Sequence, residues 1–207
     1  MRLYTSPTTP FGRKTAVLIL EAGLTDRIEI VNVSGNPLDP GSLPITRNPL
    51  GKIPALDRDD GPAIYDSRVI CRFLDDMAQA GLYPAAPLLW ETLTLEATAD
   101  GILEAALSMV YEHRMRPADK RFPAWVDAQW GKIARALDAI ESNWIGHLAG
   151  RLDMSHIALG CALGYLDFRL DARVWRQGRP QLAVWSDNFA QRPSMQATQP
   201  PAVQTAQ

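Results

Sequence analysis

Hydrophobic residues in the first eighty positions form short runs of strand length, and one longer run with helical spacing. Arg2 to Thr5 and Arg27 to Val33 predict strands, because their apolar and β-branched residues stand between turn-forming positions. Between them, Phe11 to Ala22 predicts a helix that ends at Gly23, a residue type common at helix ends. This order is a βαβ unit, so we expect two parallel strands joined by a right-handed crossover.

A second group of elements follows a long loop that is rich in Pro, Gly and Asn. Ile53 to Leu56 and Ala63 to Tyr65 flank a turn-rich segment and predict a hairpin. Asp66 and Ser67 can cap the helix that is predicted over Arg68 to Gln79. The full order, βαβ and then ββα, predicts a four-stranded mixed sheet of the thioredoxin type.

The chain changes character after residue 80, where turn-forming residues give way to helical periodicity. Tyr83 to Pro87 holds two prolines and predicts a linker. The helices predicted beyond it cover Leu88 to His113, Pro123 to His147, Met154 to Leu170 and Pro180 to Gln191. Asp153 stands just before the third of these helices and predicts its N-cap. His156 is less suited than a carboxylate to complete a capping box with it.

These elements predict an α/β domain with thioredoxin-like order, followed by an all-helical bundle. The C-terminal segment is rich in Gln, Pro and Ala and has too few large apolar residues to pack, so it predicts disorder. The predicted division is residues 1–80 for the α/β domain, 81–87 for the linker, 88–195 for the helical domain and 196–207 for a flexible tail.

Composition argues against several kinds of partner. The chain carries 21 Lys and Arg against 23 Asp and Glu, a formal net charge of −2, so we expect no nucleic-acid partner. Its two cysteines, Cys71 and Cys161, provide neither a disulfide framework nor a four-cysteine zinc site. The apolar run over residues 16–20 is too short to cross a bilayer, and no signal peptide is recognisable. We therefore expect a soluble, cytoplasmic protein without a membrane partner.

A hydroxyl stands at the predicted start of the first helix. Thr9 followed by Pro10 has the pattern of an N-cap and a first helical residue. The start of a helix presents unpaired N–H groups and the positive end of the helix dipole, which together favour an anion near the Thr9 hydroxyl. Ser6 and Thr8 are alternative hydroxyls in the same segment. The structural alternative is that Thr9 only caps the helix.

Four segments together give a resemblance to a known family. They are SPTTPFGRK at residues 6–14, NPLGKIPAL at 48–56, YDS at 65–67 and GCALGYLD at 160–167. In this order they resemble a cytosolic glutathione transferase, and residues 185–198 are similar to those of small bacterial members. The resemblance runs through nearly the whole chain, and its most specific part is NPLGKIPAL followed by the Asp-Ser pair. It implies glutathione as co-substrate, a small electrophilic acceptor, a homodimer and no metal.

The resemblance implies that Thr9 donates a hydrogen bond to the glutathione sulfur. A free thiol has a pKa of about 8.5. A hydroxyl donor at the positive end of a helix lowers that pKa and favours the nucleophilic thiolate. Related classes carry Ser or Cys at this position, and the chain departs from them with Thr. Threonine forms no mixed disulfide, which argues against glutaredoxin-like chemistry; Ser6 and Thr8 are the alternative donors.

The other glutathione contacts are also implied by the resemblance. The peptide bond before Pro54 is expected to be cis, which turns the main chain of Ile53 toward the cysteinyl backbone of glutathione. Lys52 is expected to reach the glycyl carboxylate, Ser67 the γ-glutamyl carboxylate and Asp66 the neighbouring ammonium. The alternatives are a solvated lysine and a plain capping pair. The implied glutathione-binding residues are Thr9, Phe11, Lys52, Ile53, Pro54, Asp66 and Ser67.

A polar stripe recurs with helical spacing in the helix predicted over residues 88–113. Its members are Asp100, Glu104, Ser108 and Tyr111. In the resembled fold this helix borders the acceptor cleft and the dimer interface. Phe11 and Met115 complete the predicted wall of the acceptor pocket. A solvated helix face is the structural alternative.

Two functions from different classes are compatible with these patterns. The first is an enzyme that activates the glutathione thiolate and conjugates it to a small, mostly apolar electrophile. The second is a non-catalytic binding or regulatory protein that reuses the fold, as RNA-polymerase-associated starvation proteins do. The retained Lys52, Ile53-Pro54 and Asp66-Ser67 segments favour glutathione binding, whereas the threonine at position 9 favours the second function.

Overall fold

The computed structural model describes residues 1–201, and these form two compact units. The first unit contains Met1–Pro84 together with the residues from Pro193 on, and the second contains Ala85–Arg192. The sequence division placed residues 193–195 in the helical domain, whereas here they join the first unit.

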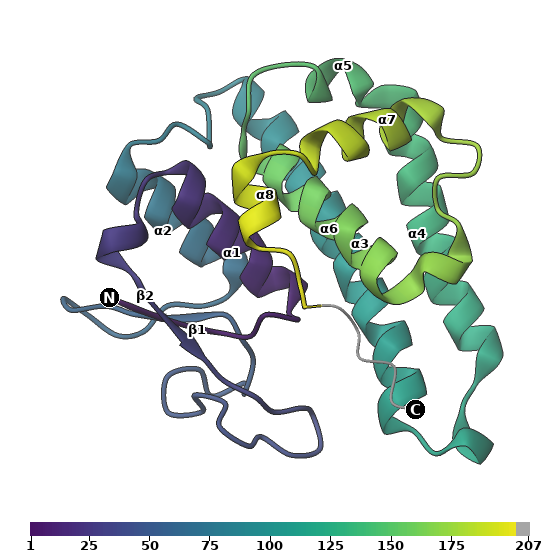
Figure 1. Cartoon of the computed structure of the whole chain (residues 1–207), viewed down its shortest axis with the longest axis horizontal. Coiled ribbons are helices and arrows are strands. Elements are labelled where there is room, and N and C mark those ends of the chain that lie inside the picture. Colours follow the sequence, from purple (N-terminus) through teal and green to yellow (C-terminus); the bar gives the residue numbers. More distant parts are fainter. Residues whose placement is uncertain (202–207) are drawn as a thin grey trace. The chain divides into compact units, whose positions relative to one another are not determined.

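The first unit has a three-stranded sheet with β1 at its centre (Figure 1). β1 pairs in parallel with β2 on one side and antiparallel with β3 on the other. The predicted βαβ unit is therefore confirmed. The elements are β1 (Arg2–Thr5), α1 (Pro10–Glu21), a 3₁₀ turn (Thr25–Arg27), β2 (Glu29–Asn32), β3 (Ala55–Asp57), α2 (Ser67–Ala78) and α8 (Pro193–Ala197).

The predicted fourth strand is wrong. Ile64 forms only an isolated antiparallel bridge to Leu56, so the expected hairpin closes with a single pair of hydrogen bonds. The physical reason is length, because α2 begins at Ser67 and leaves only two residues after Ile64 in which to extend a ladder. The thioredoxin-like order of the unit is otherwise as predicted.

Helix α1 carries much of the core of the first unit. Val17 and Leu18 are fully buried, and the helix packs against α2 and α8. The helix ends at Glu21 with Ala22 as its C-cap, and the next residue, Gly23, has a φ of +65° in the left-handed region that glycine adopts without strain.

Helix α8 corrects the predicted tail. The Arg13 guanidinium donates to the carbonyl of Met195 (3.0 Å), and the Ser194 hydroxyl donates to Glu21. Met195 is itself buried, so this short helix has an anchor that the polar composition of the segment conceals. The tail predicted from residue 196 therefore begins inside a helix, and residues 202–207 lie outside the described part of the chain.

The second unit is entirely helical over its described residues. α3 packs against both α4 and α6 (Figure 1). Almost every residue in the first three turns of α6 is buried. The helix predicted over 123–147 is divided, because α4 ends at Asn143 and a separate short helix follows. The elements are α3 (Leu88–Met115), a 3₁₀ turn (Ala118–Lys120), α4 (Pro123–Asn143), α5 (Ile145–Leu148), α6 (Met154–Leu170), a 3₁₀ turn (Asp171–Arg173) and α7 (Pro180–Phe189). Within residues 1–201, no helix combines the length and apolarity that a bilayer crossing requires.

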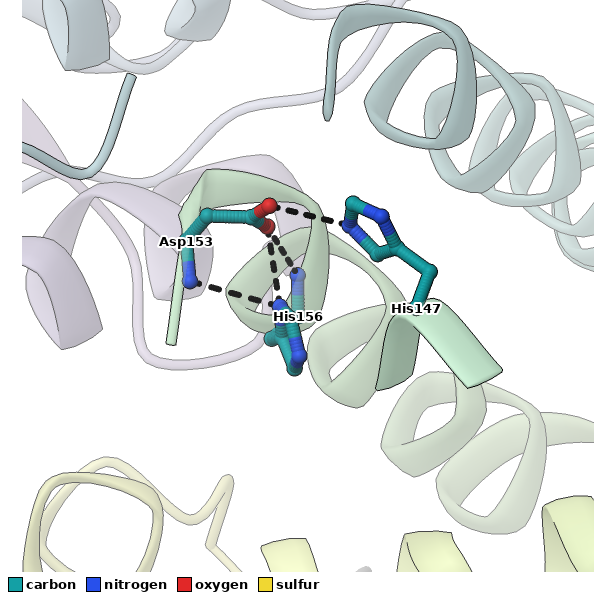
Figure 2. A group of neighbouring side chains, drawn as sticks. All are labelled: His147, Asp153 and His156. Carbon is teal, nitrogen blue, oxygen red and sulfur yellow. Dashed lines mark hydrogen bonds and ion pairs between the residues drawn. The ribbon is translucent and has the colours of Figure 1, made fainter. Parts of the chain in front are cut away.

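Asp153 caps the buried helix α6, as predicted (Figure 2). Its carboxylate accepts from the backbone N–H groups of Ser155 (2.9 Å) and His156 (3.4 Å). His156 Nδ1 lies 3.3 Å from the Asp153 backbone nitrogen and 2.8 Å from the carboxylate. The capping box is therefore complete, with His156 in the place of the usual carboxylate.

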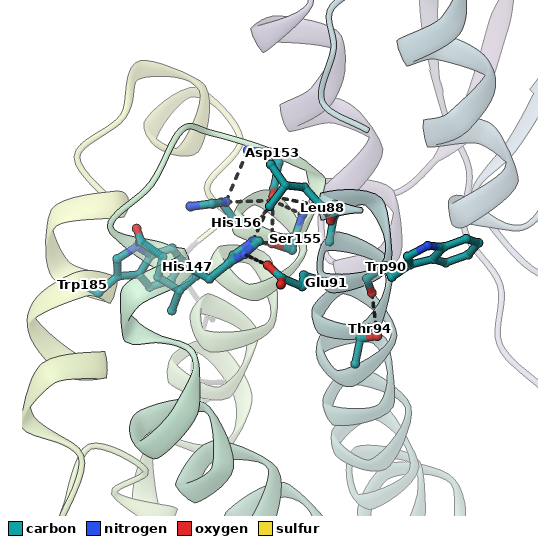
Figure 3. Close-up of polar contacts among 11 residues, drawn as sticks. Leu88, Trp90, Glu91, Thr94, His147, Asp153, Ser155, His156 and Trp185 are labelled. Carbon is teal, nitrogen blue, oxygen red and sulfur yellow. Dashed lines mark hydrogen bonds and ion pairs between the residues drawn. The ribbon is translucent and has the colours of Figure 1, made fainter. Parts of the chain in front are cut away.

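Two further helices reach the same carboxylate (Figure 3). The Thr92 hydroxyl of α3 donates to Asp153 Oδ2 (2.8 Å), and Nε2 of His147 in α5 lies 2.9 Å from the same oxygen. On its other side, His147 Nδ1 lies 3.5 Å from Glu91. Burial raises the pKa of Asp153, but hydrogen bonds from His156, Ser155 and Thr92 outweigh burial and lower it well below its usual range. The carboxylate thus joins α3, α5 and α6 as an anion.

We predict that Asp153→Ala lowers the free energy of unfolding by about 2–3 kcal/mol, since it removes a cap and leaves buried donors unpaired. Asp153→Asn keeps an acceptor oxygen and should cost less. Because the pKa of Asp153 is lower in the folded chain than the unfolded value of about 3.9, its contribution is fully present above that value and is lost progressively as the pH falls from there toward the folded pKa. Urea unfolding of the wild type and both variants between pH 3 and 7 measures this. A gap between wild type and Asp153→Ala that persists unchanged at pH 3 would contradict the ionic cap.

Candidate functional site

Three loop segments meet at the C-terminal end of β1. The register pairs Tyr4 with Ala55, which places Pro54 beside Thr5 when the antiparallel pairing is continued by one residue. The bridge between Leu56 and Ile64 places the start of α2 on the other side of β3. Residues 5–9, 53–54 and 65–67 therefore share one edge of the sheet, as the resemblance implies for a glutathione site.

Thr9 stands at the start of α1 with the backbone conformation of an N-cap (φ −85°, ψ 123°). Its side chain, however, makes no capping hydrogen bond. Thr9 is therefore the N-cap by backbone conformation only. Since Pro10 lacks an N–H, the free donors of the first turn are those of Phe11 and Gly12. The hydroxyl and these donors are available to a bound anion.

The two alternative hydroxyls have local partners instead. Ser6 Oγ lies 3.3 Å from Thr8 Oγ1, and the Thr8 backbone N–H points to the same Ser6 oxygen at 3.5 Å. The Thr9 backbone N–H in turn donates to the carbonyl of Ser6 (3.1 Å). Ser6 and Thr8 thus shape the loop before the helix, which favours Thr9 as the hydroxyl available to a ligand.

Gly12 and Thr5 were not anticipated as parts of this site. A Cβ placed on Gly12 would lie 1.9 Å from Thr5 Oγ1 and 2.5 Å from Thr9 Cγ2. The methyl group of Thr9 therefore faces Gly12, and the staggered geometry of threonine turns its hydroxyl elsewhere. Thr5 Oγ1 is buried without a hydrogen-bond partner beneath this turn. The absence of a side chain at Gly12 is what lets β1 and the start of α1 approach so closely.

The Ile53–Pro54 peptide bond is cis, as the resemblance implied. Asn48, which is 2% exposed, fixes the loop before it. The Asn48 side-chain amide donates to the carbonyl of Lys52 (2.8 Å), and its oxygen accepts from the N–H of Leu50 (3.0 Å). Ile53 is half-buried, and the Lys52 side chain is exposed. The buried Asn48 side chain thus fixes the conformation of the loop, while the predicted glutathione contacts Lys52 and Ile53 stay accessible to a ligand.

Asp66 and Ser67 form the start of α2. Asp66 accepts from the N–H of Arg68 (3.0 Å) and pairs with its guanidinium (3.1 Å). Burial raises the pKa of Asp66, but hydrogen bonds and charge from Arg68 outweigh it and lower the pKa overall. Arg68 was not among the predicted site residues. The Ser67 backbone lies at the first helical position, where its own N–H is left free by the cap.

The predicted acceptor residues lie in both units and do not share one environment. Phe11 is half-buried on α1, and the others lie on α3. Asp100 is 3% exposed and Glu104 is exposed, so these two do not form a uniform polar face. The half-buried members of the α3 set are Ser108, Tyr111 and Met115.

His147, Asp153 and His156 are the one group of three potential metal ligands within residues 1–201, with ligand atoms within 4.8 Å of one another (Figure 2). Both oxygens of Asp153 already accept hydrogen bonds, from Ser155 and from Thr92. The group also sits at the positive end of α6, which disfavours a cation. Its geometry is that of a helix cap.

Comparison with known proteins agrees with this geometry. Residues 8–77 match the family model for the N-terminal domain of glutathione S-transferase, and residues 123–188 match the model for its C-terminal domain. The chain is 37% identical to the uncharacterized GST-like protein YibF of Escherichia coli K12, over 97% of this chain and 99% of that protein.

Solved structures extend the likeness over the whole fold. A glutathione transferase family member from Pseudomonas fluorescens Pf-5, crystallised with bound glutathione, is 43% identical with a TM-score of 0.94 and covers 97% of this chain and 99% of its own. A second structure from that organism, with bound S-(propanoic acid)-glutathione, is 42% identical with a TM-score of 0.91 and covers 98% and 100%. The chain belongs to the glutathione S-transferase family.

We predict that Gly12→Ala destabilises the protein by about 1–3 kcal/mol, because the new methyl group overlaps Thr5 and Thr9. A glycine-to-alanine change inside a helix ordinarily gains up to about 1 kcal/mol. Gly101→Ala in α3, where a Cβ meets nothing within 4 Å, should show that gain. Thr5→Ala should restore part of the stability of Gly12→Ala. Equal unfolding midpoints for Gly12→Ala and Gly101→Ala would refute the close approach.

Proposed function

We propose that the protein binds glutathione through its first unit and uses the thiolate to attack a small electrophile. The observation that carries the proposal is the Thr9 side chain, which stands at the start of α1 without capping it. The bound glutathione in a relative with 43% identity over nearly the full chain supports the same ligand here.

In the proposed mechanism, Thr9 and the start of α1 stabilise the thiolate. The hydroxyl donates to the sulfur, and the free N–H groups of Phe11 and Gly12 add the positive end of the helix dipole. Charge-assisted hydrogen bonds of this kind are stronger than neutral ones, so they favour the ionised sulfur over the thiol. Binding also holds the sulfur in place for attack.

The remaining contacts hold the peptide part of glutathione. The Ile53 main chain beside the cis bond pairs with the cysteinyl backbone as an added strand would. Ser67 at the start of α2 binds the γ-glutamyl carboxylate, and Asp66 attracts the adjacent ammonium because it is ionised. Lys52, whose side chain is exposed, reaches the glycyl carboxylate.

The acceptor is a small electrophile. In the relative that holds S-(propanoic acid)-glutathione, a three-carbon acid is attached to the sulfur, which supports a small substituent at this position. The half-buried Ser108, Tyr111 and Met115 of α3 and Phe11 of α1 are the proposed acceptor contacts.

Glutathione binding followed by turnover tests the proposal. Calorimetry should show binding at millimolar glutathione or below, and Ser67→Ala should weaken it by about 1–3 kcal/mol. A panel of electrophiles should then yield conjugates at rates above the uncatalysed reaction. Binding without turnover on the whole panel would favour the non-catalytic, regulatory function, and absence of binding would reject the proposed enzyme.

We predict that Thr9→Ala raises the pKa of bound glutathione by about one to two units, which corresponds to loss of one hydrogen bond to a charged group. The absorbance of the thiolate in the binary complex, followed against pH, measures this value. Thr9→Ser should keep the wild-type pKa. Ser6→Ala and Thr8→Ala are matched controls and should leave it unchanged; a shift in either of them, with none in Thr9→Ala, would move the role to that residue.

A further inference from the structure

Helix α1 begins without the side-chain cap that ordinarily fixes the first turn of a helix. Thr9 has the backbone conformation of an N-cap, but its side chain makes no capping hydrogen bond. The first hydrogen bond of the helix runs from the Arg13 backbone N–H to the Thr9 carbonyl (3.0 Å). A helix start without a cap frays more readily, because the N–H groups of its first turn have no partner. The anion site proposed at the start of α1 therefore needs support from another part of the fold.

Helix α8, which belongs to the same unit although it lies near the other end of the chain, provides such support. The Arg13 guanidinium donates to the carbonyl of Met195 (3.0 Å) and to the hydroxyl of Thr198 (3.4 Å). The Thr198 hydroxyl in turn donates to the carbonyl of Ser194 (2.8 Å). Arg13 thus forms the first backbone hydrogen bond of α1 through its N–H and binds α8 through its side chain.

Helices α1 and α8 lie side by side and contact each other at two places (Figure 1). Ser194 at the start of α8 donates to Glu21, the last residue of α1. Arg13, one helical turn after Thr9, binds the end of α8 instead. The two helices are therefore antiparallel, and only the contact of Arg13 lies close to the proposed thiolate site.

The surroundings of Arg13 favour a firm contact. Its side chain is half-buried, and Met195, whose carbonyl it binds, is 2% exposed. Carbonyls near the end of a helix carry the negative end of the helix dipole, which favours an arginine at this place. A hydrogen bond from a charged donor is also stronger than one between neutral groups. Arg13 therefore joins a buried anchor on α8 to the second turn of α1.

We propose that Arg13 is a positioning residue, which binds α8 and thereby holds the first turn of α1 in the conformation that the glutathione thiolate requires. The inference rests on the proposed function and makes the site depend on residues 193–198. Arg13 acts on the sulfur through Thr9 and the N–H groups of the first turn. Linkage requires the reverse effect as well, so bound glutathione stabilises the attachment of α8 to α1.

The pKa of bound glutathione reports whether the start of α1 is well positioned. Arg13→Met removes the donors but keeps an unbranched side chain, and it should raise this pKa by about half a unit, because a frayed helix start stabilises an anion less. Arg13→Lys keeps a charged donor for the Met195 carbonyl and should recover at least part of the shift. Arg2→Met is the matched control at the opposite end of β1, where it removes an ion pair with Asp57, and it should leave the pKa unchanged.

A double variant separates positioning from a direct effect of the arginine charge on the sulfur. When Arg13 acts through Thr9, the pKa shift of Thr9→Ala combined with Arg13→Met is smaller than the sum of the two single shifts. We expect this result. A strictly additive shift in the folded double variant would overturn the positioning role, because it would show that Arg13 acts on the sulfur independently of Thr9.

Amide hydrogen exchange on the full chain gives a readout that does not depend on turnover. In the ligand-free protein, Arg13→Met should speed exchange of the amide at position 13 by at least about threefold, while the amides of β1 exchange as in the wild type. Saturating glutathione should slow exchange of the α8 amides in the wild type but not in Arg13→Met. Normal glutathione binding with unchanged exchange and an unchanged thiolate pKa in Arg13→Met would overturn the inference alone. Absence of glutathione binding by the wild type would overturn the proposed function, and the inference with it.

Discussion

The pairing of β1 with two neighbours of opposite direction is the constraint on which the first unit depends. Parallel pairing with β2 requires α1 to cross over the sheet, and antiparallel pairing with β3 brings Pro54 back beside the end of β1. Both pairings bring segments to the same edge of the sheet, because the loop that leads into α1 starts at the end of β1. This register places Pro54 beside Thr5, from which the loop that contains Thr9 begins. The candidate site follows from strand order before any side chain is considered.

Helix starts in this chain are used in two different ways. Asp66 caps α2 and Asp153 caps α6, each through hydrogen bonds to backbone N–H groups of the first turn. Thr9 has the conformation of a cap but leaves the first turn of α1 unsatisfied. A missing cap costs about 1 kcal/mol, and the buried Thr5 hydroxyl nearby adds a further cost. In the proposed function a bound thiolate accepts the hydrogen bonds that a cap would accept. The missing cap therefore lowers the stability of the protein only when no ligand is bound.

Local signals in the sequence predicted the elements well, and long-range packing explains the failures. Gly23 and Asp153 each mark a helix boundary through chemistry confined to one turn, so both are readable from sequence. The predicted fourth strand failed because its pairing depends on how soon α2 begins, and the tail prediction failed because Met195 and Arg13 stabilise α8 across more than 180 positions of sequence. The contacts of His147 could not be predicted for the same reason. Its partners Glu91 and Asp153 lie far apart in the sequence and become neighbours only when three helices pack.

The same distinction applies to the proposed ligand contacts. Those for glutathione are built from main-chain features, namely a cis peptide bond, two helix starts and a close glycine, and each requires a particular residue type at a fixed place. Such features leave a motif, which is why NPLGKIPAL and Asp-Ser were informative. The proposed acceptor contacts on α3 are instead single side chains of a long helix, and serine, tyrosine and methionine are ordinary residues there. A motif can therefore identify the shared co-substrate, whereas the acceptor contacts leave no comparable pattern in the sequence.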